Sequence, residues 1–114
     1  MILPSKIRFA DERLKKAFAE LQFSKTEDKK LFKFLTRAFV DIEKNAFCGI
    51  QIPKHLMPKE YLKKTNFNSY WKYDLPNAWR LIYIVGKEEV IVVSIVLEWM
   101  NHKEYGRKFR YTSK

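Results

Sequence analysis

The sequence is poor in cysteine, glycine and proline, which number one, three and four among its 114 residues. With Cys48 as the only cysteine, the chain can form neither an intramolecular disulfide nor a cysteine-based metal site. We expect Cys48 to be a small buried hydrophobic residue, because nothing nearby in the sequence would lower its pKa. The sequence also lacks a glycine-rich phosphate loop, a His-x-x-x-His pair and acids at two-metal spacing, so we expect no cofactor and no metal.

Long apolar runs are equally scarce. The longest, from Val90 to Leu97, is interrupted by Ser94 and is too short to span a bilayer. The stretch from Met1 to Phe9 lacks the apolar core of a signal peptide. We therefore expect a cytoplasmic protein without a membrane partner.

Acidic residues are outnumbered by basic ones, with 13 Asp and Glu against 23 Lys and Arg. The net charge of +10 and the pI of about 9.7 create a positive field that steers the protein towards polyanions. Charge alone allows nucleic acid, an acidic protein or an anionic membrane surface as the partner, and of these we expect nucleic acid and an acidic protein. Hydrophobic residues at 46% and aromatic residues at 16% predict a packed core, and the length predicts a single domain over residues 1–114.

The first half of the sequence predicts a hairpin of two helices. Asp11 is a suitable N-cap for the first helix, and Ser24 and Glu27 have the spacing of a capping box for the second. We expect Gly49 to end the second helix. The short connection between the helices makes them antiparallel neighbours. The apolar stripes are formed by Leu14, Ala17, Phe18 and Leu21 in the first helix and by Leu31, Leu35, Ala38, Phe39, Ile42 and Ala46 in the second.

From Tyr70 the apolar period changes from about 3.6 residues to about 2, which indicates strands. Two strands separated by a turn at 75–78 are followed by a tight turn at 86–88 and a central strand at 90–97 that is buried on both faces. These segments predict an antiparallel meander of three strands, with a possible fourth at 6–9. A helical turn at 58–64 and a short C-terminal helix at 101–110 complete an α+β fold in which the hairpin packs on the sheet.

The sequence WKYDLPNAWRLIY at 71–83, the strand at 90–97 and the sequence NHKEY at 101–105 resemble the RelE/ParE toxin superfamily. The resemblance implies a two-helix hairpin before an antiparallel sheet, and a toxin of a type II toxin–antitoxin pair. RelE-like members cut mRNA in the ribosomal A site without a metal, whereas ParE-like members share the fold and poison DNA gyrase. We expect the RelE-like activity, with mRNA, ribosomal RNA and an acidic antitoxin as partners. A ParE-like inhibitor and an inactive basic nucleic-acid-binding domain of the same fold are the alternatives.

Four residues match the catalytic positions of the RelE-like branch: Arg80, His102, Lys72 and Tyr105. Metal-free RNA cleavage requires proton transfer, for which histidine is suited, and stabilisation of a crowded phosphorane, for which the arginine fork is suited. Tyrosine can stack on a base or orient the nucleophile. Lys72 and Arg80 lie on adjoining antiparallel strands, on the face that Trp79 and Leu81 do not occupy, so we expect both side chains on one face of the sheet, away from the core.

Several assignments near this motif stay open. Asp74 stands where the family has a second lysine, and it is either a base or an ion-pair partner of Lys72 or Arg80. Phe109 and Tyr111 are alternatives to Tyr105, and Glu98 is more simply a solvated strand end than a base. We interpret His55 as a loop residue. The basic residues expected to contact RNA phosphates are Lys63, Lys64, Arg107, Lys108 and Arg110.

Overall fold

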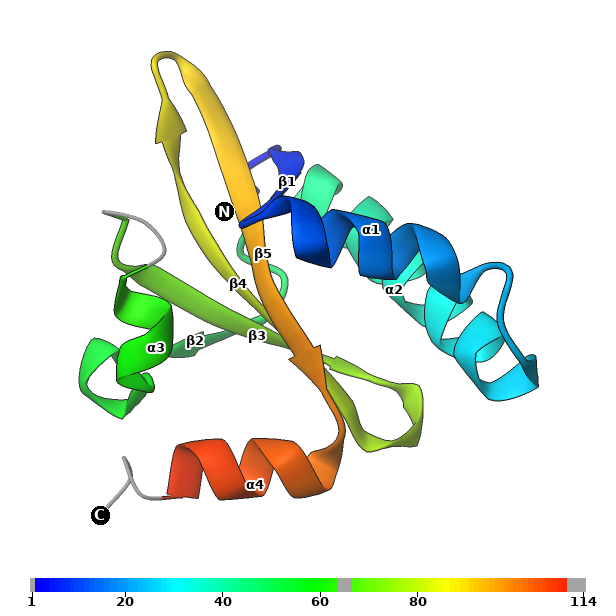
Figure 1. Cartoon of the computed structure of the whole chain (residues 1–114). Helices are drawn as coiled ribbons and strands as arrows, with labels where there is room; N and C mark the ends of the chain where they lie inside the picture. Colours follow the sequence, from blue (N-terminus) through cyan, green and yellow to red (C-terminus); the bar gives the residue numbers. More distant parts are fainter. Residues whose placement is uncertain (1, 64–66, 111–114) are drawn as a thin grey trace.

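The computed structural model describes residues 2–63 and 67–110, which form one mixed sheet with helices on both of its faces (Figure 1). The strands have the order β1-β5-β4-β3-β2; β1 is parallel to β5 and every other neighbouring pair is antiparallel. The elements along the chain are β1 (Lys6–Phe9), α1 (Glu12–Leu21), α2 (Thr26–Lys44), β2 (Ile50–Ile52), a 3₁₀ turn (Lys54–Leu56), α3 (Lys59–Leu62), β3 (Ser69–Leu75), a second 3₁₀ turn (Pro76–Ala78), β4 (Trp79–Glu88), β5 (Ile91–Met100) and α4 (His102–Arg110).

The α+β class is confirmed, whereas the expected antiparallel sheet of three or four strands is wrong in two respects. The sheet has five strands, because the three-residue β2 pairs with β3 at one edge. It is also mixed, because the N-terminal strand runs parallel to β5. A strand of three residues is too short to show an alternating pattern, and its direction in the sheet depends on contacts that are distant in sequence.

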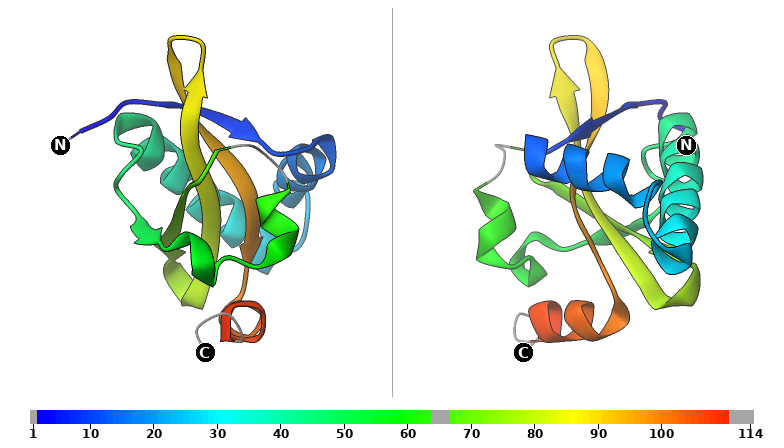
Figure 2. Two further views of the ribbon diagram at one scale, coloured as in Figure 1. Left: turned by 90° about the vertical axis from the view of Figure 1, so that its left-hand side faces the viewer. Right: turned by 45° about the vertical axis from the view of Figure 1, so that its right-hand side comes forward.

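Helices cover the sheet on two sides (Figure 2). The hairpin of α1 and α2 packs against one face, where Leu35, Ile42 and Tyr83 are fully buried. On the opposite face α3 and α4 cover a second apolar cluster that includes Ile82 and Leu97. This second cluster corrects the expectation that the face carrying Arg80 lies away from the core.

Local side-chain chemistry explains how the hairpin begins and ends. Asp11 caps α1 as predicted, since its carboxylate accepts a hydrogen bond from the Leu14 N–H at 2.9 Å. The capping box is wrong: the Ser24 hydroxyl instead donates to the Glu20 carbonyl at 3.0 Å. The predicted end at Gly49 is also wrong, because α2 stops at Lys44 and Asn45 turns the chain. The Asn45 side-chain oxygen accepts hydrogen bonds from the backbone N–H groups of Leu3 and Phe47, both at 3.1 Å.

The early end of α2 changes the position of Cys48. Cys48 lies in the loop after the helix and is exposed, which contradicts the expectation that it is buried. The partial burial of the thiol and the charge of Asp41 raise the pKa of Cys48. The thiol is therefore predominantly protonated at neutral pH.

The two sheet turns differ in how well they follow the sequence. The predicted turn between β3 and β4 is present, and Asn77 and Ala78 adopt positive φ angles of 61° and 62°. The predicted turn at 86–88 is wrong, because these residues continue β4, and Glu89 and Val90 form the turn. Gly86 lies against the ring of Phe67, where a side chain would collide with the ring. This glycine therefore provides space rather than a turn.

No helix in the described ranges is long and apolar enough to cross a membrane.

Two glycine-to-alanine substitutions should change the free energy of unfolding in opposite directions. A Cβ at Gly49 would collide with the backbone carbonyl of Lys72 and the hydroxyl of Tyr83, so Gly49→Ala should lower the free energy of unfolding by about 2 kcal/mol. Gly106 lies within α4 with nothing near its missing Cβ, so Gly106→Ala should raise it by about 0.5–1 kcal/mol. Urea unfolding followed by circular dichroism measures both. Equal shifts for the two variants would contradict this packing.

Tyr73 predicts a stability effect at alkaline pH. Its hydroxyl donates to the Asp41 carboxylate at 2.5 Å, which joins β3 to α2, and burial together with this bond raises the pKa of Tyr73 to about 12. The folded state therefore holds the proton more tightly than the unfolded chain, and the resulting stability is lost as pH rises from 10 through about 12. The stability difference between the wild type and Tyr73→Phe should shrink over that range in urea unfolding. A difference that stays constant would contradict the raised pKa.

Candidate functional site

The candidate site lies at the end of the β3–β4 hairpin, on the face covered by α4. The antiparallel register places Asp74 opposite Arg80 and Lys72 opposite Ile82. Because side chains alternate along a strand, Lys72, Asp74 and Arg80 share the face of Ile82, while Trp79 packs on the opposite face. The prediction that Lys72 and Arg80 project from the same face of the sheet is confirmed.

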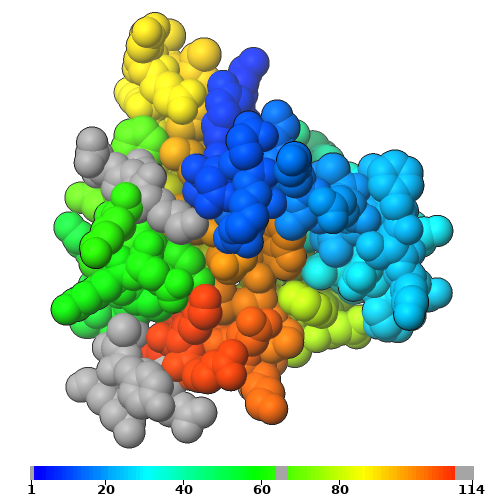
Figure 3. All heavy atoms as spheres, viewed as in Figure 1, coloured from blue at the N-terminus to red at the C-terminus, as the bar shows by residue number. Residues whose placement is uncertain are grey.

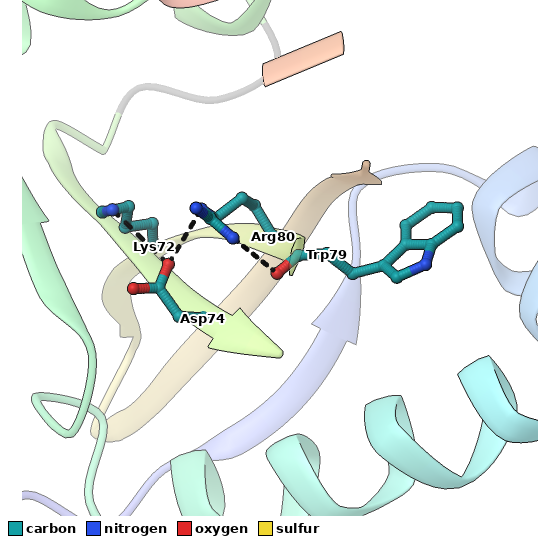
Figure 4. A network of polar contacts seen from close by, with 4 residues as sticks. All are labelled: Lys72, Asp74, Trp79 and Arg80. Carbon is teal, nitrogen blue, oxygen red and sulfur yellow. Dashed lines mark hydrogen bonds and ion pairs between the residues drawn. The ribbon is translucent and has the colours of Figure 1, made fainter. Parts of the chain in front are cut away.

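One carboxylate lies between the two cations (Figure 4). Asp74 Oδ1 is 3.4 Å from Lys72 Nζ and 3.1 Å from Arg80 Nε. Of the two open roles for Asp74, the ion-pair partner is therefore present, and it serves Lys72 and Arg80 together. The three side chains carry a net charge of +1, so the cluster keeps an excess of positive charge.

Arg80 is held more by packing and charge than by hydrogen bonds. Its Nη1 donates to the Trp79 carbonyl at 3.3 Å. Its Nε is buried and, within the described part of the chain, has no hydrogen-bond partner. The short distance to Asp74 thus reflects an ion pair in which the N–H bond does not point at the carboxylate oxygen. A buried donor without an acceptor costs free energy.

Tyr105 on α4 covers both cations. The centre of its ring is 5.3 Å from Lys72 Nζ and 5.5 Å from the guanidinium carbon of Arg80, within the range of cation–π attraction. Phe109, one turn later, is buried, and its ring stacks on the Tyr105 ring with 4.4 Å between the ring centres. Burial raises the pKa of Tyr105, and the charge of Arg80 opposes this rise. Of the two described aromatic candidates in this segment, Tyr105 is the one that meets the cations.

His102 lies beside this cluster rather than within it. It is exposed and is the first residue of α4. In the described part of the chain, no hydrogen bond, ion pair or ring contact joins it to Lys72, Arg80 or Tyr105. His102 precedes Tyr105 by three residues, however, and residues at this spacing are neighbours on a helix surface. The structure therefore places the predicted proton-transfer residue at the border of the site.

Lys108 contacts two residues of α3, which the sequence did not indicate. Its ammonium lies 3.5 Å from Glu60 Oε1 and 3.3 Å from the Tyr61 hydroxyl, and it also faces the Tyr61 ring. Tyr61 is almost fully buried, and burial with the charges of Glu98 and Glu60 raises its pKa. These contacts fasten α4 to α3, whose surfaces adjoin in Figure 3. Glu60 and Lys108 are 48 residues apart, so no local pattern signals the pair.

Of the other predicted phosphate-binding residues, the structure describes the side chains of two. Lys63 follows α3 and Arg107 lies on α4, and both are exposed. Arg110 is the last residue of α4, and its side chain lies outside what the structure describes, as do Lys64 and Tyr111. His55 lies exposed in the 3₁₀ turn at 54–56, in agreement with its interpretation as a loop residue.

The described residues contain no group of three or more His, Cys, Asp or Glu side chains that could hold a metal ion. Chemically, the cluster combines two cations with one half-exposed carboxylate and an aromatic ring. Such a site suits a phosphate group.

Comparisons of this chain with protein-family models, curated proteins and solved structures gave no match. The resemblance to the RelE/ParE superfamily therefore stays a prediction that rests on the sequence around 71–105.

Tyr105 gives a prediction that separates ring contacts from its hydroxyl. Tyr105→Ala removes the ring from Lys72, Arg80 and Phe109 and should lower the free energy of unfolding by about 1–3 kcal/mol. Tyr105→Phe keeps the ring and should cost less than about 1 kcal/mol. Chemical unfolding of the two variants measures the difference. Equal losses would contradict a role for the ring in holding α4 over the cations.

Proposed function

We propose that this chain is a cytoplasmic toxin of a type II toxin–antitoxin system, a RelE-like endoribonuclease that cleaves mRNA on the ribosome without a metal. The observation that carries the proposal is the convergence of Lys72 and Arg80 beneath the ring of Tyr105. These residues come from two strands and a helix, and all three match positions in the sequence resemblance. The net charge of +10 supports an RNA partner.

In this proposal the cations act on the scissile phosphate. Arg80 presents a planar fork of N–H donors, which can contact two phosphate oxygens at once and stabilise the charge that develops in the phosphorane. Lys72 adds a second positive charge from the neighbouring strand. Both side chains are about four-fifths buried, at 18% exposure for Arg80 and 20% for Lys72, and reduced contact with water strengthens such electrostatic interactions.

Tyr105 and His102 supply the remaining functions. Tyr105 holds its ring against both cations and against Phe109, and its hydroxyl, which is protonated at neutral pH, can orient the nucleophile. His102 is exposed on α4, where it can accept the proton of the 2′-hydroxyl or donate one to the 5′-oxygen. Lys63 and Arg107 extend the positive surface available to the RNA backbone. An acidic antitoxin would complement the same charge.

The separation of His102 from the cations favours a second candidate function. If no proton-transfer group reaches the bound phosphate, the site binds without cleaving, as a ParE-like gyrase inhibitor or an inactive nucleic-acid-binding domain would. Asp74 also neutralises part of the positive charge that a nuclease would use. The two candidates differ in one measurable property, which is cleavage of mRNA.

The cleavage test uses Arg80→Ala with Arg37→Ala as its matched control. Arg37 also pairs with an aspartate, at 3.5 Å from Asp41, but it belongs to α2, which packs on the opposite face of the sheet. Arg80→Ala should reduce the rate of mRNA cleavage by about a hundredfold or more, because transition-state charge loses its stabilisation. Arg37→Ala should leave the rate unchanged. Primer extension on mRNA from translating ribosomes measures cleavage, and circular dichroism verifies folding. Full cleavage by Arg80→Ala would contradict the site assignment.

His102→Ala should reduce the cleavage rate by about 10²–10⁴-fold and flatten the pH–rate profile near neutrality. His55→Ala, which removes the other histidine, is the control and should keep the wild-type cleavage rate and pH–rate profile. A normal pH profile in His102→Ala would remove His102 from the mechanism. Absence of cleavage by the wild type, together with inhibition of gyrase, would establish the ParE-like alternative.

A further inference from the structure

We propose that Asp74 is an internal competitor for the RNA phosphate: its carboxylate occupies the position between Lys72 and Arg80 that a phosphate takes, and RNA displaces it on binding. This inference rests on the proposed function only in naming RNA as the ligand. It assigns to Asp74 a role that neither a catalytic base nor a purely structural ion pair would have.

The relative exposure of the three side chains supports this role. Lys72 and Arg80 are 20% and 18% exposed, whereas Asp74 is 47% exposed. The carboxylate thus lies on the solvent side of two cations that are mostly covered. A ligand that approaches the cations from solvent meets Asp74 first, and its phosphate must take over the contacts of Asp74 Oδ1.

The geometry of the ion pair shows that Asp74 is an imperfect partner. Its Oδ1 is 3.1 Å from Arg80 Nε, yet that N–H group has no hydrogen-bond acceptor among the described residues. The same oxygen is 3.4 Å from Lys72 Nζ, which is longer than an optimal charge-assisted hydrogen bond. A phosphate has several oxygens in a tetrahedral arrangement and can accept from both cations with better alignment. The exchange of carboxylate for phosphate therefore improves the hydrogen-bond geometry at each cation.

Displacement of Asp74 requires only a side-chain rotation. Its backbone is paired with Arg80 in the β3–β4 ladder, and the turn at 76–78 follows two residues later. Asp74 can therefore leave the cations without a change in the strands. Lys72 and Arg80 stay in place, because Tyr105 covers both of them.

The test compares Asp74→Asn with the wild type in binding a short 2′-O-methyl single-stranded RNA, which cannot be cleaved through its 2′ position. Fluorescence anisotropy measures the dissociation constant. Removal of the competing charge while the side-chain shape is kept should tighten binding by about tenfold. Asp74→Asn should tighten binding less in an Arg80→Gln background than in the wild type, because Arg80 is one of the two cations that Asp74 blocks.

Glu88→Gln is the matched control for net charge. Glu88 pairs with Arg8 at 3.4 Å and is 49% exposed, and it lies at the opposite end of β4 from Arg80. Each substitution removes one negative charge and so raises the net charge by one unit, but Glu88→Gln should tighten binding by no more than about twofold. Equal gains in the two variants would overturn the proposal, because they would reflect net charge alone.

Two other outcomes would also overturn the proposal. Weaker binding by Asp74→Asn would show that the carboxylate positions the cations. Unchanged binding with lost cleavage would show that Asp74 is a base. Failure of the wild type to cleave mRNA, by contrast, would refute the proposed nuclease activity and leave a tighter Asp74→Asn complex as support for competition.

Discussion

The register between β3 and β4 is the constraint on which the candidate site depends. It pairs Asp74 with Arg80 and places Lys72 on the same face, two residues away. A shift of one residue would turn Arg80 into the apolar cluster under α1 and α2 and turn Trp79 towards α4. The turn at Pro76–Ala78, with two successive positive φ angles, holds the strands in this register. The site is therefore a consequence of the same alternation that builds the core.

The sheet buries both of its faces, and this explains why the site is partly enclosed. The helical hairpin covers one face, and α3 with α4 covers the other. Lys108, through Glu60 and Tyr61, joins the two short helices. Because α4 is fastened in this way, Tyr105 stays over the cations. Apolar packing and charged contacts thus both hold α4 against the sheet.

Regular apolar patterns were the part of the fold that the sequence predicted well. The stripe from Leu31 to Ala46 is buried as expected, and the strands follow the alternation that begins near Tyr70. The turn and helix-end predictions were wrong where one residue type can serve more than one structural role. Gly86 makes space for Phe67 instead of a turn, and Asn45 rather than Gly49 turns the chain after α2. The pairing of β1 with β5 depends on residues almost 90 positions apart, and no local pattern carries that information.

The candidate site was predicted only in part, because several of its features depend on contacts between residues that are distant in sequence. The shared face of Lys72 and Arg80 follows from strand alternation, and the structure places Tyr105 over both. The burial of Arg80, its unpartnered Nε and the position of Asp74 between the cations depend on the packing of α4. His102 is exposed at the start of α4, and its role in proton transfer stays a prediction.

The central claim is that Arg80 is the anion-binding group of this protein. Side-chain NMR of ¹⁵N-labelled arginine tests it most directly, because each Nε–H group gives its own signal. On titration with a short 2′-O-methyl RNA, the Arg80 Nε–H signal should shift most and saturate, as the unpartnered donor gains a phosphate acceptor. The signals of the more exposed Arg8 and Arg37 should move little. A shift confined to such exposed arginines, with Arg80 unchanged, would contradict the account.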